Sequence, residues 1–342
     1  MRVIVRQVVL GSRALSRRAM LRGVGAAGCA SALSACSGMA TPGAIFAASD
    51  ISITAAVLVA TNRKPVSGAR AKPWFGTGRA STTFARAKLT PPDGGRFSLA
   101  AVGLSDWRLD EVEQKAQFGD LFPPERSGRD LFIYVPGFNQ TFEMVVLDAA
   151  RLSDAIKFQG STMAFSWPSK ANLLDYGYDR ESAMWSRDAL ERVFDQAIVN
   201  SDIGRTHIVA HSVGTMLVLE ALRELYARQP ALSVERIGSV VFAAPDIDID
   251  VFSSSVARIG PLASKITVIT SRNDRALAIS GLIAGGITRV GSAEKARLEG
   301  LGLRVIDASQ EGWGIINHDL FLSDGKIQRV IRNAIEGHPM GA

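Results

Sequence analysis

The stretch that decides the fold is Thr206-His207-Ile208-Val209-Ala210-His211-Ser212-Val213-Gly214. A mainly apolar run, typical of a buried strand, leads directly into Ser212, and Thr215–Arg228 follows with the composition of a strong helix. Small residues, Ala210 and Gly214, stand two positions before and after the serine. A sharp turn from strand to helix requires them, because a bulky side chain would collide with the strand or the helix. The pattern predicts a reactive serine at this turn; the alternative is a serine that only caps the helix.

Outward from this turn, short apolar runs alternate with helical periods over the rest of the chain after Arg129. The runs are Leu131–Val135, Thr162–Trp167, Thr206–His211, Ser239–Ala244, Lys265–Thr270 and Leu303–Ile306. This alternation predicts an α/β protein with a mostly parallel sheet and helices on both faces. Before Arg129 the strand-like runs Ile51–Ala60, Thr82–Leu89 and Arg96–Val102 are separated by turn residues, which predicts an antiparallel N-terminal edge.

The serine turn resembles the G-x-S-x-G nucleophile elbow of α/β hydrolases, with Ala210 in place of the first glycine. Such an elbow needs two backbone N–H groups that hold an oxyanion. Val213, directly after the serine, supplies the first. Pro136-Gly137-Phe138-Asn139 follows an early strand and supplies the second: Gly137 allows close approach, and the N–H of Phe138 or Asn139 donates because proline has none. The alternative is a simple turn in which Asn139 caps the next helix.

The general base must come from four histidines. His207 lies within a strand, His211 points away from Ser212 by alternation, and His338 lies near the C-terminus. His318 remains, in a loop after the last strand-like run, where the chain order of this fold places the base. The alternative is an ordinary surface histidine.

The acid of the site should follow the end of a strand. Asp274 follows the run Lys265–Thr270, and Asp246 follows Ser239–Ala244. We favour Asp274 and keep Asp246 as the alternative. The acid would accept the second imidazole N–H and stabilise the imidazolium. The competing interpretations are ion pairing of Asp274 with a nearby arginine and helix capping by Asp246.

The N-terminal residues have the pattern of an export signal. Residues 1–35 contain the pair Arg17-Arg18 and a short apolar run, which resembles a twin-arginine signal. Leu33-Ser34-Ala35-Cys36 resembles a bacterial lipoprotein box, in which the Cys36 thiol carries lipid. The pattern predicts a tether over residues 36–50, one hydrolase domain over 51–335 and a tail over 336–342. We therefore expect an exported lipoprotein at the cell envelope, facing the periplasm or the exterior.

The charge of the chain excludes some partners. Lys and Arg exceed Asp and Glu by six, and six arginines lie within residues 1–35 with no acidic residue. The remaining chain is balanced, so nothing predicts a nucleic-acid partner. Four scattered histidines offer no metal-ligand spacing, and we expect no metal and no cofactor.

Several ordered motifs together resemble a known family. They are Thr61-Asn62-Arg63, Val135-Pro136-Gly137-Phe138-Asn139, Phe165-Ser166-Trp167-Pro168-Ser169, Tyr178-Asp179-Arg180-Glu181-Ser182, Ala210-His211-Ser212-Val213-Gly214 and Ala244-Pro245-Asp246-Ile247-Asp248. Over about residues 51–335 the chain is similar to uncharacterised bacterial α/β hydrolases of the esterase/lipase superfamily. The resemblance implies the α/β-hydrolase fold and a Ser-His-Asp mechanism, and it implies no particular substrate.

The sequence thus predicts a serine hydrolase that cleaves a small-molecule or lipid ester, or a related acyl bond, through an acyl-enzyme. Two alternatives remain open. The same residues could serve a thioesterase or another acyl transferase. A non-catalytic envelope lipoprotein could use the scaffold only for binding.

Overall fold

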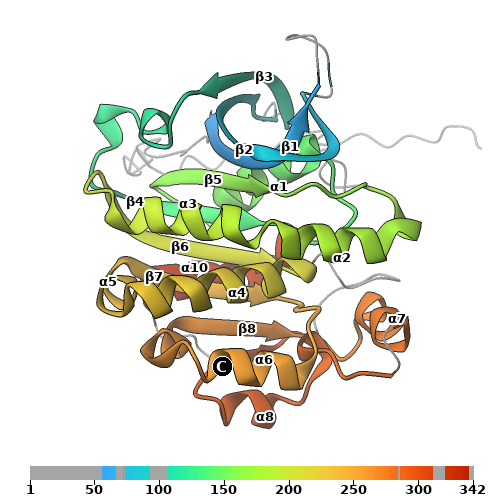
Figure 1. The fold of residues 1–342 in the computed structure, drawn as a ribbon. Coiled ribbons are helices and arrows are strands. Elements are labelled where there is room, and N and C mark those ends of the chain that lie inside the picture. The colour runs from blue at the N-terminus through green and yellow to red at the C-terminus, as the bar shows by residue number, and fades with distance from the viewer. Residues whose placement is uncertain are drawn as a thin grey trace, which may run out of the picture. The chain divides into compact units, whose positions relative to one another are not determined.

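The predicted strands form one twisted sheet in the computed structural model, which describes residues 56–66, 72, 74–92, 107–283, 286–310 and 320–338. Within these residues nine strands lie in the order β3-β2-β1-β5-β4-β6-β7-β8-β9 (Figure 1). They are β1 (Ala56–Pro65), β2 (Phe75–Thr90), β3 (Arg108–Lys115), β4 (Arg129–Val135), β5 (Ser161–Ser166), β6 (Ile203–His211), β7 (Ile237–Ala243), β8 (Ile266–Thr270) and β9 (Arg304–Asp307). The β3-β2-β1 pairs are antiparallel and the other pairs are parallel, as the sequence predicts.

The six runs after Arg129 are confirmed as β4 to β9. The strands at the middle of the sheet are buried on both faces, which explains why they are apolar without alternation. At the N-terminal edge, β2 is longer than predicted, and the predicted strand 96–102 lies outside the described residues. The sequence prediction missed β3 because this edge strand is charged and largely exposed, so it contains no apolar run.

The helices divide between the two faces of the sheet (Figure 1). They are α1 (Phe142–Ala155), α2 (Tyr176–Trp185), α3 (Arg187–Val199), α4 (Val213–Arg228), α5 (Pro230–Arg236), α6 (Ile249–Val256), α7 (Arg275–Ile283), α8 (Lys295–Glu299), α9 (Leu320–Ser323) and α10 (Gly325–Glu336). Helices α1, α9 and α10 pack in one apolar core. Helices α2 to α6 and α8 pack in the core on the opposite face, so the prediction of helices on both faces is confirmed.

The order of the strands changes direction at β4. After β4 the chain runs through α1, on one face of the sheet, to β5, which pairs with one side of β4. Strand β6 pairs with the other side of β4 and continues into α4 on the opposite face. In parallel sheets, loops that diverge in this way open a ligand-binding crevice at the carboxyl ends of the strands. The residues that follow β4 and β6 are Pro136 and Ser212, so the predicted oxyanion loop and the predicted nucleophile both lie at this point.

The predictions for residues 1–35 and 36–50, including lipidated Cys36, concern residues outside those described. Among the helices that the structure does describe, none combines the length and the apolar character that crossing a bilayer requires.

Candidate functional site

Ser212 stands at a strained turn between β6 and α4. Its backbone has φ 51° and ψ −122°, a conformation that is unfavourable for a residue with a side chain. Three backbone hydrogen bonds hold it there: Ser212 N–H donates to Ala243 O (3.0 Å), and Ser212 O accepts from Thr215 N–H (3.1 Å) and Asp246 N–H (3.2 Å). Strain of this kind costs about 1–3 kcal/mol and persists only where the surroundings enforce it. Ser212 does not cap α4 through its side chain, so the capping alternative is wrong.

The small residues around the serine are required by contact. A Cβ atom on Gly214 would lie 2.3 Å from Pro136 O and 2.9 Å from Val135 O, which no side chain can occupy. Ala210 is fully buried and pairs in register with Val135 on one side and with Phe242 on the other. The glycine therefore allows the first turn of α4 to pass directly under the loop that follows β4.

Gly137 brings that loop against the nucleophile. A Cβ atom at this position would lie 3.0 Å from Ser212 Cβ and 3.0 Å from His211 Nδ1. Val213 is the first residue of α4, where backbone N–H groups have no acceptor within the helix. The structure thus brings together Gly137, Ser212 and Val213, three of the predicted site residues.

Asn139 has a different role from the one considered for it. Its backbone N–H donates to Asp179 Oδ2 at 3.0 Å, and its φ is 61°. The N-cap of α1 is Thr141, whose hydroxyl accepts from Met144 N–H at 3.1 Å, so helix capping by Asn139 is wrong. Because the Asn139 N–H is already used, Phe138 is the remaining candidate for the second oxyanion donor. The Phe138 ring packs edge-on against Tyr176 at 5.2 Å.

A buried polar cluster supports the loop from behind. Asp179 is fully buried in α2 and accepts hydrogen bonds from Asn139 N–H (3.0 Å), Lys170 N–H (2.8 Å) and the Ser169 hydroxyl (2.5 Å). The Ser169 oxygen in turn accepts from Gln140 N–H at 3.1 Å. Two consecutive backbone groups of the loop are therefore fixed by side chains from outside it.

Arg63 completes this support from β1. It is 1% exposed, and its guanidinium donates to Gln140 O (2.6 Å), Ser169 O (3.0 Å) and Ser166 Oγ (2.8 Å). Burial lowers the pKa of Arg63 to about 10, although the nearby Asp179 charge acts in the opposite direction. The arginine is still charged at neutral pH. Trp167, also fully buried, donates its indole N–H to Pro136 O at 3.1 Å and holds the start of the loop.

The roles of Arg63, Ser169 and Asp179 were not predicted from the sequence. Each belongs to a motif used for the family resemblance, but the roles depend on contacts across 29 to 77 positions of the chain, as between Arg63 and Gln140. The signal that could have found Arg63 is a charged residue within an apolar strand, since a buried charge must be hydrogen-bonded or paired.

The histidines are placed as follows. His318, the predicted base, lies outside the described residues. His211 is buried, and its ring lies 4.6 Å from that of Phe321 at the start of α9, directly after the segment that holds His318. His338 is exposed and pairs with Glu336.

His207 belongs to a second grouping of serine, histidine and aspartate. Its Nδ1 lies 2.9 Å from Ser239 Oγ and its Nε2 3.3 Å from Asp130 Oδ2. Ser239 is buried within β7 in ordinary extended backbone, two positions after the start of that strand, and so lies at the opposite end of the sheet from Ser212. This arrangement has neither an elbow nor a helix start beside the serine, and we interpret it as structural, as expected for a histidine within a strand.

The two candidate acids differ in their surroundings. Asp274 is buried in the turn after β8, and its Oδ1 accepts from Leu277 N–H (3.1 Å) at the start of α7. The ion pairing considered for it is not seen with Arg272, which lies 3.6 Å from Asp307.

Asp246 is the centre of a dense cluster. Its Oδ1 accepts from the Ser280 hydroxyl (2.6 Å) and lies 3.0 Å from Arg289 Nε, and its Oδ2 accepts from the Tyr176 hydroxyl (2.6 Å). Burial and the Asp246 carboxylate both raise the pKa of Tyr176. Helix capping by Asp246 is wrong, because Asp248 caps α6.

No group of three or more His, Cys, Asp or Glu side chains within the described part of the chain is arranged to hold a metal ion.

Comparison with known families matches residues 111–334, more than half of the chain, to the family described as "alpha/beta hydrolase of unknown function (DUF900)". The chain belongs to this family. The predicted fold class and the resemblance to α/β hydrolases are therefore confirmed.

Individual relatives are distant. A 63-residue segment is 33% identical to the uncharacterized protein alr1448 of Nostoc, covering 18% of the hydrolase and only 16% of that protein. Among solved structures, TT1662 from Thermus thermophilus is 14% identical with a TM-score of 0.41, over 75% of the hydrolase and 92% of that chain. An esterase from Rhizomucor miehei is 11% identical with a TM-score of 0.38, over 82% of each chain. Such distant likenesses assign no substrate to the hydrolase.

Proposed function

We propose that the hydrolase cleaves carboxylic esters through an acyl-enzyme on Ser212. Ser212 Oγ attacks the carbonyl carbon and passes its proton to His318, which gives that proton to the departing alcohol. Water then attacks the acyl-enzyme, losing a proton to His318, and the acid leaves as Ser212 regains a proton. The N–H groups of Val213 and Phe138 stabilise the oxyanion in both steps, and Gly137 leaves room for the carbonyl.

The observation that carries this proposal is the strained Ser212 turn, which Gly137 approaches so closely that a Cβ atom at Gly137 would lie 3.0 Å from Ser212 Cβ. A serine that only filled space would gain nothing from φ 51°, whereas a nucleophile gains a fixed position beside a helix start and a second loop of backbone donors.

The contacts of Asp246 favour Asp274 as the acid that pairs with His318. Asp246 already lies beside buried Arg289 and accepts from two hydroxyls, so its charge is balanced without a histidine. We therefore propose that Asp274 orients His318. We further propose that Cys36 carries lipid, which would place the hydrolase and its small-molecule or lipid ester substrates at the cell envelope.

The test is labelling of the purified full chain with a fluorophosphonate, together with hydrolysis of 4-nitrophenyl esters of graded chain length. We expect labelling and hydrolysis in the wild type and loss of both in Ser212→Ala. Ser239→Ala is the matched control, because it removes the other buried serine beside a histidine and should keep the label. Labelling that survives in Ser212→Ala, or a folded wild type that neither reacts nor hydrolyses any ester, would overturn the proposal.

The choice of acid is tested by Asp274→Asn and Asp246→Asn. A triad acid replaced by its amide loses roughly 10⁴-fold in kcat while the fold is kept. We expect this loss for Asp274→Asn, and a loss of stability as the main effect of Asp246→Asn. The reverse pattern would make Asp246 the acid.

A further inference from the structure

Arg180 on α2 is a half-buried cation with no acidic partner among the described residues. Its hydrogen bonds are all long and all lead to neutral acceptors: Nη1 to the Tyr176 hydroxyl (3.3 Å), Nη1 to Asp246 O (3.4 Å) and Nη2 to Met216 Sδ (3.5 Å). A guanidinium has five N–H donors, and charged groups removed from water normally find a carboxylate or several short hydrogen bonds. Arg180 has neither within the part of the chain that the structure describes.

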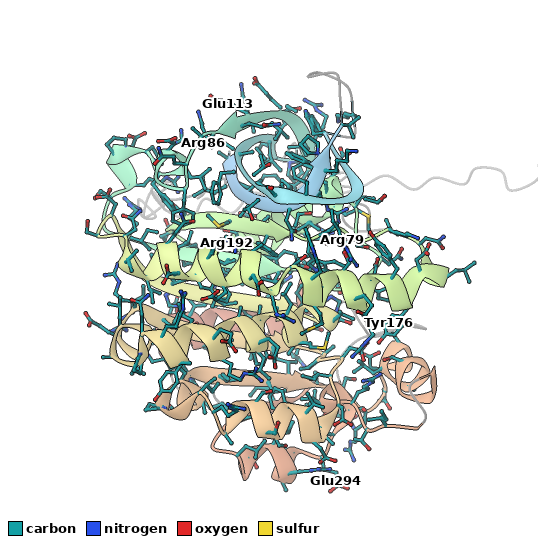
Figure 2. All side chains as sticks on the ribbon, viewed as in Figure 1. Arg79, Arg86, Glu113, Tyr176, Arg192 and Glu294 are labelled. Carbon is teal, nitrogen blue, oxygen red and sulfur yellow. The ribbon has the colours of Figure 1, made fainter. Side chains whose placement is uncertain are left out.

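The residues that the guanidinium contacts are connected to the proposed nucleophile and oxyanion loop. Met216 follows Ser212 by one turn of α4, about 6 Å along the helix axis. Asp246 is bonded through its N–H to Ser212 O at 3.2 Å. Tyr176, the first residue of α2 (Figure 2), contacts Phe138, the proposed oxyanion donor, and its hydroxyl lies 2.9 Å from Ser280 Oγ in α7. Each of the three neighbours of Arg180 is therefore linked to Ser212 or to Phe138 by one helical turn or one contact.

The acidic groups near Arg180 are engaged elsewhere. Asp246 faces Arg289, which is 3% exposed and 3.0 Å from its Oδ1. Asp175 pairs with Lys170 at 3.0 Å, and Asp179 points to the loop after β4. The carboxylate of Asp246 thus forms its ion pair with Arg289 and not with Arg180.

We propose that Arg180 binds an anionic group of the substrate. This inference rests on the proposed ester hydrolysis and narrows its substrate class to esters that carry a carboxylate or a phosphate-type group near the scissile bond. Arginine suits both, because its planar fork binds two oxygens of an anion at once. The weak present contacts can be exchanged for an anion at little cost.

The test compares two esters of equal chain length, 4-nitrophenyl hexanoate and mono-4-nitrophenyl adipate, which differ by a terminal carboxylate. A third ester with a terminal phosphonate, 4-nitrophenyl 5-phosphonopentanoate, distinguishes the two kinds of anion. In Arg180→Met we expect kcat/KM for the preferred anionic ester to fall about tenfold or more through KM, with the neutral ester nearly unchanged. Arg180→Lys should keep part of the preference.

Arg192→Met is the matched control. Arg192 lies exposed on neighbouring α3 (Figure 2) and its loss changes the net charge equally. An anionic-to-neutral ratio that is the same in Arg180→Met and the wild type would overturn the role of Arg180, as would an equal fall in Arg192→Met.

Binding of the same esters to Ser212→Ala, measured by calorimetry, separates the two proposals. Binding of an anionic ester that depends on Arg180, without any hydrolysis by the wild type, would keep the anion site and overturn the esterase proposal. Hydrolysis with no dependence on Arg180 would do the opposite, and the absence of both would overturn both.

Discussion

Replacing Asp179 by alanine tests whether the buried cluster behind the loop after β4 supports catalysis. The substitution removes the acceptor of two backbone N–H groups, Asn139 and Lys170, and of the Ser169 hydroxyl. The hydroxyl can turn to another acceptor, but the two N–H groups cannot. Each unsatisfied N–H costs about 1–3 kcal/mol, and both are only partly buried, so we expect a loss of about 2–4 kcal/mol in the free energy of unfolding.

The same change should reduce turnover. Phe138 precedes Asn139, so a loop that is no longer held at Asn139 no longer fixes the Phe138 N–H. Complete loss of an oxyanion donor costs about 10²–10³ in kcat, and we expect roughly tenfold to hundredfold for a loosened one. The assays are urea denaturation and hydrolysis of 4-nitrophenyl butyrate at a temperature at which the variant is folded.

Asp175→Ala is the control for both measurements. Asp175 precedes the same helix, but its ion pair with Lys170 is partly exposed, so its loss should cost less than about 1 kcal/mol and leave kcat unchanged. A folded Asp179→Ala variant with the kcat of the wild type would refute the proposed connection between the cluster and the oxyanion donor.

Three further predictions follow from single contacts. Gly214→Ala places a Cβ atom 2.3 Å from Pro136 O and should lower the free energy of unfolding, measured by denaturation, by roughly 3 kcal/mol or more. In the control Gly177→Ala the new Cβ meets no atom within 4 Å, and the change should stabilise α2 by about 0.5–1 kcal/mol. Equal stability of the two variants would contradict this prediction. The hydrogen bond with His207 lowers the pKa of Asp130, so the contribution of this carboxylate to stability is present above the usual carboxyl pKa and is lost as the pH falls through the lowered value. The difference in the free energy of unfolding between wild type and Asp130→Asn should therefore shrink from pH 7 to pH 3. A constant difference would count against the pairing. Tyr176→Phe removes the hydroxyl bonded to Asp246 but keeps the ring beside Phe138. We expect the free energy of unfolding to fall by about 1–2 kcal/mol, with kcat for neutral esters within a few-fold of wild type. A large loss of kcat would show that the hydroxyl takes part in catalysis.

The parallel part of the sheet was predictable because burial on both faces leaves a clear mark in the sequence. Strands β4 to β9 are apolar runs, and their ends were found to within a few residues. The Ser212 turn was predictable for the same reason, since the strand, the small residues and the helix are all local. In contrast, β3 and α2 lack such a mark. Strand β3 is a charged edge strand, and α2 begins with polar and aromatic residues whose buried side faces the loop after β4.

The supporting cluster could not be predicted because its energy comes from contacts between distant segments. Nothing in the residues around Asn139 indicates that its N–H is taken by Asp179 from α2; the local pattern suggested an oxyanion donor, with a helix cap as the alternative. The sequence likewise favoured Asp274 but left Asp246 open as the alternative, because both follow the ends of neighbouring strands. Their difference appears only once Tyr176, Ser280 and Arg289 are seen to surround one of them.

Arg63 has a consequence for how the chain can be shortened. The match to the family spans residues 111–334, yet the arginine that fixes Gln140 and Ser169 lies on β1, well before that match begins. A truncated protein starting at residue 111 would retain the elbow and both candidate acids. It would lose the Arg63 guanidinium that donates to the backbone oxygens of Gln140 and Ser169. The hairpin of β1 and β2 thus supports the proposed site, and we expect the smallest active fragment to include it.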